Sequence, residues 1–417
     1  MRAVCFVERM EFQASGNVFP NSMALGDVNN DGDSELVVGN TSGELTIFKG
    51  EKILQTFTKL GMITAVGIGD IFNNGQNALV VVSGDGWCRI LFNSKSTDAT
   101  NEQVCGLSVV HAQQIPPNTK VVLLEDVDGD GCIELVLALT DRVVRSYRWE
   151  CEEITSTGNI ASGSKGNIGN PSYPGKLRGL NKWEFASQIG SVTINHNADG
   201  TPCLLVAQPG GTFMKIRCPE PGTKDTGDLA PSYIDYHPLS QCHMRNPNVS
   251  TEILGDIEPP ASLRKGERGM RYAVATLDGT LMLVEDEEIL WSIQVDHQLF
   301  ALTKLKILDG SDETGENIVA CSWDGQTYIL DQEKKSVRFQ LEESVHAFCA
   351  GYYSTEPGKH PVPCLVYTTF TNKIYLYYNV SLPSMVTRRF TPPVNNGSED
   401  SHKKRKLTEW VLYGISE

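Results

Sequence analysis

Short apolar runs separated by polar turns recur along this 417-residue chain as far as Val380. One example is the run Leu36–Gly39, which is followed by the turn Thr41–Gly43 and then by a second run, Leu45–Phe48. Runs of four to eight residues that are rich in Val, Ile and Leu and are bounded by Gly, Asn or Asp predict β-strands. The pattern therefore favours an all-β protein built from short strands and tight turns.

The same order of elements occurs seven times: a strand, a variable loop, a strand, a turn that often contains Asp-Gly, and a strand. The units begin near Asn21, Thr64, Val121, Ser191, Ser250, Ala301 and His346. A single unit cannot bury both of its faces, whereas a ring of units can, so the repeat predicts a seven-bladed β-propeller. The last unit shows only three clear strands. We expect the N-terminal strand Ala3–Val7 to pair with Ile374–Val380 and to close the last blade, because closure removes open strand edges.

Three stretches interrupt the repeat with polar, Gly-, Ser- or Pro-rich sequence, and we expect them to be inserted loops of a propeller that spans residues 1–383. They are residues 151–181, 219–248 and 258–270. Residues 384–417 are predicted to form a flexible tail. The basic run His402–Lys406 in this tail is more typical of a solvated segment than of a nuclear-import signal.

Two acidic loops carry the candidate chemistry of the chain. The sequence DVDGDGCIE (Asp126–Glu134) spaces carboxylates two residues apart and has a glycine at the expected reversal, which is the layout of a loop folded around Ca²⁺. The sequence DVNNDGDSE (Asp27–Glu35) repeats this layout. An EF-hand needs its glutamate at position twelve, whereas here position nine is acidic and a strand follows. The predicted ligands are Asp126, Asp128, Asp130, the Cys132 carbonyl and Glu134 in one loop, and Asp27, Asn29, Asp31, Asp33 and Glu35 in the other. The alternative is that both loops are metal-free turns.

Composition and charge narrow the function classes. A net charge of −15 argues against binding to nucleic acid or directly to anionic lipid. The 11 cysteines never form CxxC and several lie in apolar runs, as expected for reduced thiols in the cytoplasm. We find no signal-peptide pattern at the N-terminus and no apolar run long enough to span a membrane. No GxSxG, Walker or HExxH motif occurs, so we expect a protein that is not an enzyme.

The pattern DxDxDGxx[DE] followed by LVVG or LVLA resembles the FG-GAP repeat of integrin α-subunit propellers. Longer stretches are similar to the family of integrin-alpha FG-GAP repeat-containing protein 2, and the resemblance covers most of residues 1–380. They include PNTKV (117–121), TDRVVR (140–145), TLDGTL (276–281), VDHQLFAL (295–302), WDGQTYI (323–329) and VRFQ (337–340).

This resemblance implies a scaffold subunit of the KICSTOR complex. Its implied partners are a kaptin-like propeller, an SZT-like large subunit and the other KICSTOR subunits, which together tether the GATOR GTPase-activating complex at the lysosomal surface. The implied output is restraint of mTOR complex 1 when amino acids are scarce, carried out by a cytoplasmic protein that is recruited to lysosomes, with a nuclear pool as a further option. The alternative is an integrin-like, calcium-dependent adhesion propeller. The acidic loops and the Asn-x-Ser/Thr sequons favour that alternative, and the unpaired cysteines and absent signal peptide oppose it.

Overall fold

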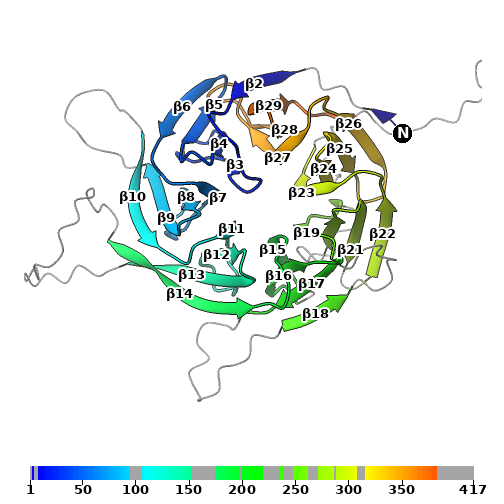
Figure 1. Ribbon diagram of the computed structural model, residues 1–417, viewed down its shortest axis with the longest axis horizontal. Coiled ribbons are helices and arrows are strands. Elements are labelled where there is room, and N and C mark those ends of the chain that lie inside the picture. The colour runs from blue at the N-terminus through cyan, green and yellow to red at the C-terminus, as the bar shows by residue number, and fades with distance from the viewer. Residues whose placement is uncertain are drawn as a thin grey trace, which may run out of the picture. The chain divides into compact units, whose positions relative to one another are not determined.

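The computed structural model describes residues 2–3, 8–93, 106–151, 174–197, 199–218, 234–238, 248–261, 271–285, 288–307 and 315–382. Within these residues the strands form seven sheets, which are arranged as a ring around a central opening (Figure 1). The first strands of neighbouring sheets contact one another around the whole ring, including β27 of the last sheet and β3 of the first. The prediction of a seven-bladed β-propeller is confirmed.

Each blade is a meander of antiparallel strands numbered outward from the central opening. Blades 1 to 4 consist of β3 (Met23–Gly26), β4 (Glu35–Gly39), β5 (Leu45–Lys49) and β6 (Lys52–Phe57); β7 (Ile63–Gly69), β8 (Ala78–Ser83), β9 (Trp87–Asn93) and β10 (Leu107–Gln114); β11 (Thr119–Glu125), β12 (Glu134–Leu139), β13 (Val143–Cys151) and β14 (Gly175–Glu184); and β15 (Val192–His196), β16 (Pro202–Gln208), β17 (Thr212–Ile216) and β18 (Ile234–Pro238). Blades 5 to 7 consist of β19 (Thr251–Ile257), β20 (Arg271–Thr276), β21 (Thr280–Glu285) and β22 (Glu288–Gln294); β23 (Leu299–Leu305), β24 (Asn317–Ser322), β25 (Gln326–Leu330), β26 (Ser336–Gln340) and β1 (Arg2–Ala3); and β27 (Val345–Tyr353), β28 (Val362–Thr369), β29 (Lys373–Tyr378) and β2 (Arg9–Gln13).

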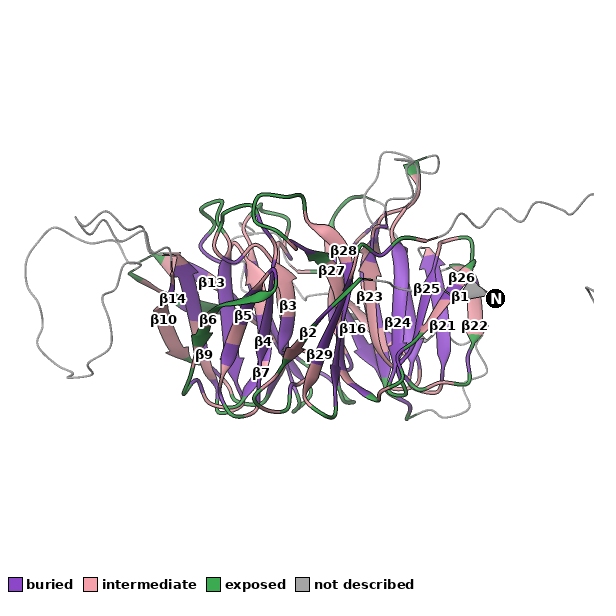
Figure 2. Cartoon of the chain, turned by 90° about the horizontal axis from the view of Figure 1, so that it is seen from above, coloured by how far each residue is buried: buried purple, intermediate pink, exposed green. Residues whose placement is uncertain are grey.

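The hydrophobic core lies between the blades. The second strand of a blade is apolar on both faces because each face packs on a neighbouring blade, and every residue of β4, β8, β12, β20 and β24 is buried. Figure 2 shows these middle strands as buried and the turns at the two faces of the ring as mostly exposed. One cluster, for example, joins Ile90 of blade 2 to Leu135 and Trp149 of blade 3. Stability therefore depends on contacts between blades as much as on pairing within them.

The ring is closed by the N-terminal segment, but not by the strand that the sequence predicts. Strand β2 (Arg9–Gln13) pairs antiparallel with β29 and completes blade 7, so closure is confirmed and the choice of Ala3–Val7 is wrong. Arg2 and Ala3 form β1, which pairs in parallel with β26 of blade 6, and residues 4–7 lie outside the described residues. Strand β2 alternates exposed and more buried residues, as the outermost strand of a blade should.

The predicted insertions are shorter than the sequence indicates. Strand β13 extends to Cys151 and β14 begins at Gly175, so both ends of the predicted loop 151–181 are strand. The outer strand β14 is exposed along most of its length, which explains why its polar sequence resembles a loop. Strand β18 lies inside the predicted loop 219–248. Residues 152–173, 219–233, 239–247, 262–270 and 383–417 lie outside the described residues, and this includes the predicted tail.

Candidate functional site

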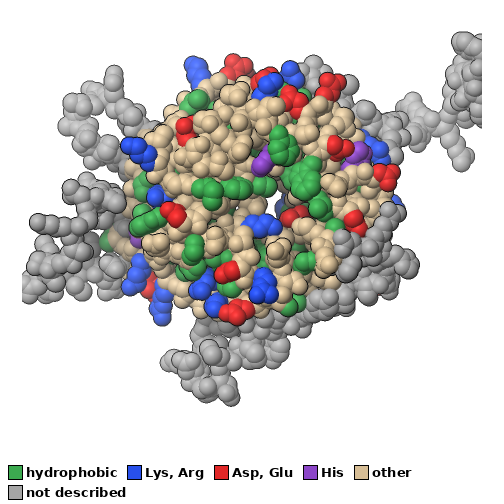
Figure 3. All heavy atoms as spheres, in the orientation of Figure 1, with side chains coloured by type: hydrophobic (Ala, Val, Ile, Leu, Met, Phe, Trp, Pro, Cys, Tyr) green, Lys and Arg blue, Asp and Glu red, His purple; other side chains and the backbone are tan. Residues whose placement is uncertain are grey.

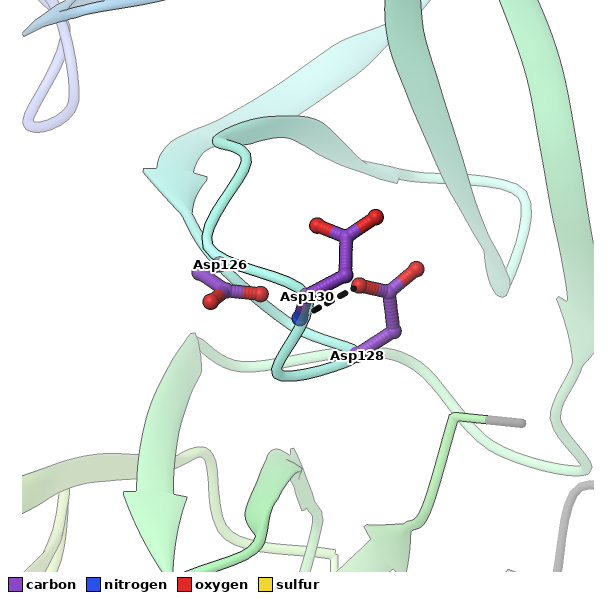
Figure 4. A group of neighbouring side chains, drawn as sticks. All are labelled: Asp126, Asp128 and Asp130. Atoms are coloured by element: carbon purple, nitrogen blue, oxygen red, sulfur yellow. Dashed lines mark hydrogen bonds between the residues drawn. The ribbon is translucent and has the colours of Figure 1, made fainter. Parts of the chain in front are cut away.

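The acidic loop Asp126–Glu134 connects β11 to β12. The Asp126 carboxylate accepts hydrogen bonds from the backbone N–H groups of Gly129 (2.7 Å) and Gly131 (2.8 Å), and both glycines have positive φ. Asp130 accepts from the N–H of Cys132 (2.8 Å). One carboxylate oxygen from each of Asp126, Asp128 and Asp130 lies within 4.8 Å of the others (Figure 4). The loop therefore brings together the three aspartates that the sequence predicts.

A guanidinium group from the neighbouring strand reaches into this loop. Arg148 of β13 donates to Asp128 (2.9 Å), Asp130 (2.7 Å) and, through Nε, the buried Glu134 (2.7 Å). The second oxygen of Glu134 accepts from the N–H of Val127 (3.0 Å). Three of the four predicted side-chain ligands are thus already paired with a cation that belongs to the chain.

The first loop, Asp27–Glu35, has the same construction. The ammonium of Lys49 on β5 is paired with Asp31, Asp33 (2.8 Å) and the buried Glu35 (3.1 Å). Asp27 accepts from the N–H groups of Asp31 and Gly32, as Asp126 does in the other loop.

Three predicted ligands of these loops make contacts of other kinds. Asn29 donates its side-chain amide to Asp31. Asp33 also accepts from the N–H of Gly358 (3.0 Å) in blade 7, so this side chain links two blades. Cys132 contributes its N–H, to Asp130.

Burial opposes ionisation of the last carboxylate in each loop. Burial raises the pKa of Glu134 to about 7, against the opposite effects of the Val127 N–H and Arg148. Burial also raises the pKa of Glu35 to about 7, against the Val28 N–H and Lys49. For Lys49 and Arg148, burial lowers the pKa, but their hydrogen bonds to the carboxylates outweigh it and the net pKa of each is raised.

Whether these residues fit a calcium ion depends on the paired oxygens. The donor set, carboxylates at two-residue spacing, suits a hard cation. However, the side-chain cation already lies among the oxygens, and the residues do not fit a metal ion in addition to it. Calcium at these loops stays a prediction from the sequence.

A second feature is a row of aromatic side chains on blades 6 and 7, which we call the aromatic strip and define as Phe300, Trp323, His346 and Phe370. The rings of Phe300 and Trp323 are stacked with centroids 6.0 Å apart, and those of His346 and Phe370 meet edge to face at 4.9 Å. Trp323 is 42% exposed and Phe370 is 59% exposed. Figure 3 shows hydrophobic side chains gathered beside the central opening over these blades.

Backbone hydrogen bonds join the two halves of the aromatic strip. The carbonyl of Trp323, in the β24–β25 turn, accepts from the N–H of Val345, and the N–H of Phe370, in the β28–β29 turn, donates to Ser344. Exposed carboxylates surround the strip at Asp296, Asp324 and Glu342. Burial lowers the pKa of His346, which keeps this ring neutral at pH 7. The strip is therefore an apolar surface with an acidic border.

Comparison with known proteins decides the family. The family model described as integrin-alpha FG-GAP repeat-containing protein 2 matches residues 49–382, and the FG-GAP repeat model matches residues 19–48. The chain belongs to the integrin-alpha FG-GAP repeat-containing protein 2 family. A relative named KICSTOR complex protein ITFG2 from Mus musculus is 41% identical over 408 residues, covering 92% of this chain and 87% of the mouse protein. The protein of the same name from Bos taurus is 39% identical over 413 residues, covering 92% of this chain and 73% of that protein.

Solved structures support the fold of this family member. The crystal structure of BBS1N in complex with ARL6DN, soaked with lead, matches with a TM-score of 0.59 at 13% identity, over 93% of this chain and 99% of that chain. This likeness shows the propeller fold alone. In the part of the chain that the structure describes, no helix is long and apolar enough to cross a membrane.

Proposed function

We propose that this family member is a subunit of a KICSTOR complex and acts as a non-catalytic scaffold. The observation that carries the proposal is the match to relatives named KICSTOR complex proteins over 92% of the chain. In the proposed role the propeller is held between a kaptin-like and an SZT-like subunit at the lysosomal surface. The complex tethers GATOR there and restrains mTOR complex 1 when amino acids are scarce. A rigid β framework with exposed turns suits this role, because binding residues usually lie on loops that a scaffold positions.

We further propose that the aromatic strip contacts one of these subunits. Tryptophan and other aromatic side chains supply much of the binding energy at protein interfaces, and they do so best in the centre of a patch. The carboxylates at Asp296, Asp324 and Glu342 favour a partner segment that presents Arg or Lys beside an apolar side chain. The proposed occupant is therefore a basic, apolar segment of another KICSTOR subunit.

Co-purification from cells tests both statements separately. Tagged full-length chain should recover the kaptin-like and SZT-like subunits, and recovery of neither contradicts the KICSTOR role. The double variant Trp323→Ala/Phe370→Ala should lose at least one of them by tenfold or more, whereas Ile53→Ala, an equally exposed apolar residue on β6, should not. Full recovery with the double variant would contradict the role of the aromatic strip while leaving the KICSTOR role intact.

Cells and imaging supply the remaining test. Loss of the protein should leave mTOR complex 1 signalling high during amino-acid starvation, and re-expression should restore its shut-off. The tagged chain should lie on lysosomes. Surface display on intact cells would instead favour the integrin-like adhesion alternative.

A further inference from the structure

The pairing between each acidic loop and a basic side chain occupies one fixed place in the blade. Glu35 and Lys49 lie one residue beyond the Leu36–Phe48 pair of β4 and β5. Glu134 and Arg148 lie one residue beyond the Leu135–Tyr147 pair of β12 and β13. Arg148 follows Glu134 by 14 residues, and Lys49 follows Glu35 by the same interval. The basic residue is therefore built into the repeat as the cross-strand neighbour of the last loop acid.

Blade 5 holds the same pair with the signs exchanged. Arg271 of β20 is paired in register with Glu285 of β21, again 14 residues later, and its Nε lies 3.0 Å from the glutamate. No DxDxDG sequence precedes β20. The place in the blade thus accommodates an internal ion pair even where no calcium-type loop is present.

Blade 2 shows what remains when both charges are absent. The equivalent positions are Ala78 and Phe92, which lie one residue beyond the Leu79–Leu91 pair. Its loop still turns in the same way, because Asp70 accepts from the N–H groups of Asn74 (3.0 Å) and Gly75 (2.6 Å) as Asp27 and Asp126 do in their loops. The turn itself therefore needs only the first aspartate, and the additional carboxylates occur together with a basic residue that neutralises them.

From these three comparisons we propose that Lys49 and Arg148 are the resident cations of the two acidic loops, in the place that calcium takes in metal-binding FG-GAP loops. A tethered cation is present at every calcium concentration, so the propeller is stable without the metal. Calcium could enter only by displacing an ammonium or guanidinium group that already contacts three carboxylates. Lys49 is a single point charge and Arg148 a fork of donors, so the first loop should yield to a metal more readily than the second.

Thermal unfolding of the full-length chain in 5 mM CaCl₂ and in 5 mM EGTA tests the proposal. The unchanged protein should give the same Tm in both conditions. Arg148→Met keeps the apolar stem but leaves Asp128, Asp130 and Glu134 without their partner, so its Tm in EGTA should be lower. Calcium should then raise the Tm of this variant, on the order of 2 °C. Lys49→Met should behave in the same way.

Arg178→Met is the matched control, since Arg178 lies directly across from Arg148 on β14 but is paired with Glu150 instead of the loop. This variant should show no calcium response. Calorimetric titration with Ca²⁺ should detect binding to Arg148→Met and Lys49→Met but not to the unchanged protein.

A calcium-dependent Tm of the unchanged protein, or calcium binding to it, would overturn the proposal, and so would variants that are neither destabilised nor calcium-responsive. If Arg148→Met does not fold, Lys49→Met and the conservative Arg148→Lys carry the test. Arg148→Lys should fold and remain indifferent to calcium.

Discussion

Closure of the propeller by β2 can be tested at Met10. This side chain is only 7% exposed and packs in a cluster that includes Ile374 and Leu376 of blade 7 and Leu36 of blade 1. Met10→Ala removes the buried thioether and leaves a cavity between the first and last blades. We expect the free energy of unfolding to fall by about 2–4 kcal/mol, because burial of a Met side chain contributes roughly 1.5–3 kcal/mol and the unfilled cavity adds to the loss.

Gln13→Ala is the matched control on the same strand, because Gln13 is exposed. It should change the free energy of unfolding by less than about 0.5 kcal/mol. Urea unfolding followed by tryptophan fluorescence measures both variants. Deleting residues 1–13 should destabilise the protein more than Met10→Ala does, whereas deleting residues 395–417 should not. Equal stability of Met10→Ala and Gln13→Ala would refute the reasoning that β2 closes the ring.

Two further predictions concern a turn and a buried charge. Gly279 and Gly32 both have φ near +90°, but an added Cβ at Gly279 would lie 2.0 Å from the Val295 carbonyl, whereas at Gly32 no atom lies within 4 Å. Gly32→Ala should therefore cost only the left-handed strain of about 1–2 kcal/mol, and Gly279→Ala clearly more, in the same urea assay; equal costs would contradict the clash. Burial raises the pKa of Glu252 above 4.5, against the opposing Lys120, so the folded state holds this proton more tightly than the unfolded state. Stability contributed by the protonated form is lost as pH rises through the raised pKa, so the Tm of Glu252→Gln relative to the unchanged protein should increase from pH 5 to pH 8, and a constant difference would contradict this.

The sequence predicts the three inner strands of each blade well because their burial is nearly complete. Strand β8, ALVVVS, is buried at every position, so its apolar run is unbroken. The outer strands have one exposed side and are harder to recognise. In β14 few side chains besides Leu177 and Trp183 are buried, and the polar residues between them resemble a loop. The same reason explains the wrong choice of closing strand, because Ala3–Val7 is more apolar than Arg9–Gln13 while the outermost position calls for alternation.

The acidic loops are predictable from their spacing, but the cations within them are not recognised by reading the loops alone. Lys49 and Arg148 lie one strand away, and only the register of the blade brings them back to Glu35 and Glu134. The signal is nevertheless in the sequence, as a base at one constant interval after the last acid in two units and as an acid at the same interval after a base in a third. The aromatic strip has no such signal, because Trp323 and Phe370 belong to turns of different blades and only the ring brings these turns together.

The interior beneath the aromatic strip explains how closure and binding are connected. The hydroxyl groups of Thr327 in blade 6 and Tyr367 in blade 7 are 2.8 Å apart and fully buried, and the ring of Tyr367 also contacts Phe348 and Phe339. Blades 6 and 7 are therefore fixed against each other by a buried polar bridge within aromatic packing, which tolerates little displacement. Because β2 completes blade 7, loosening it should disturb the spacing of the two turns that carry Trp323 and Phe370. A variant such as Met10→Ala should thus weaken partner binding in proportion to its loss of stability, whereas Trp323→Ala should weaken binding with little change in stability.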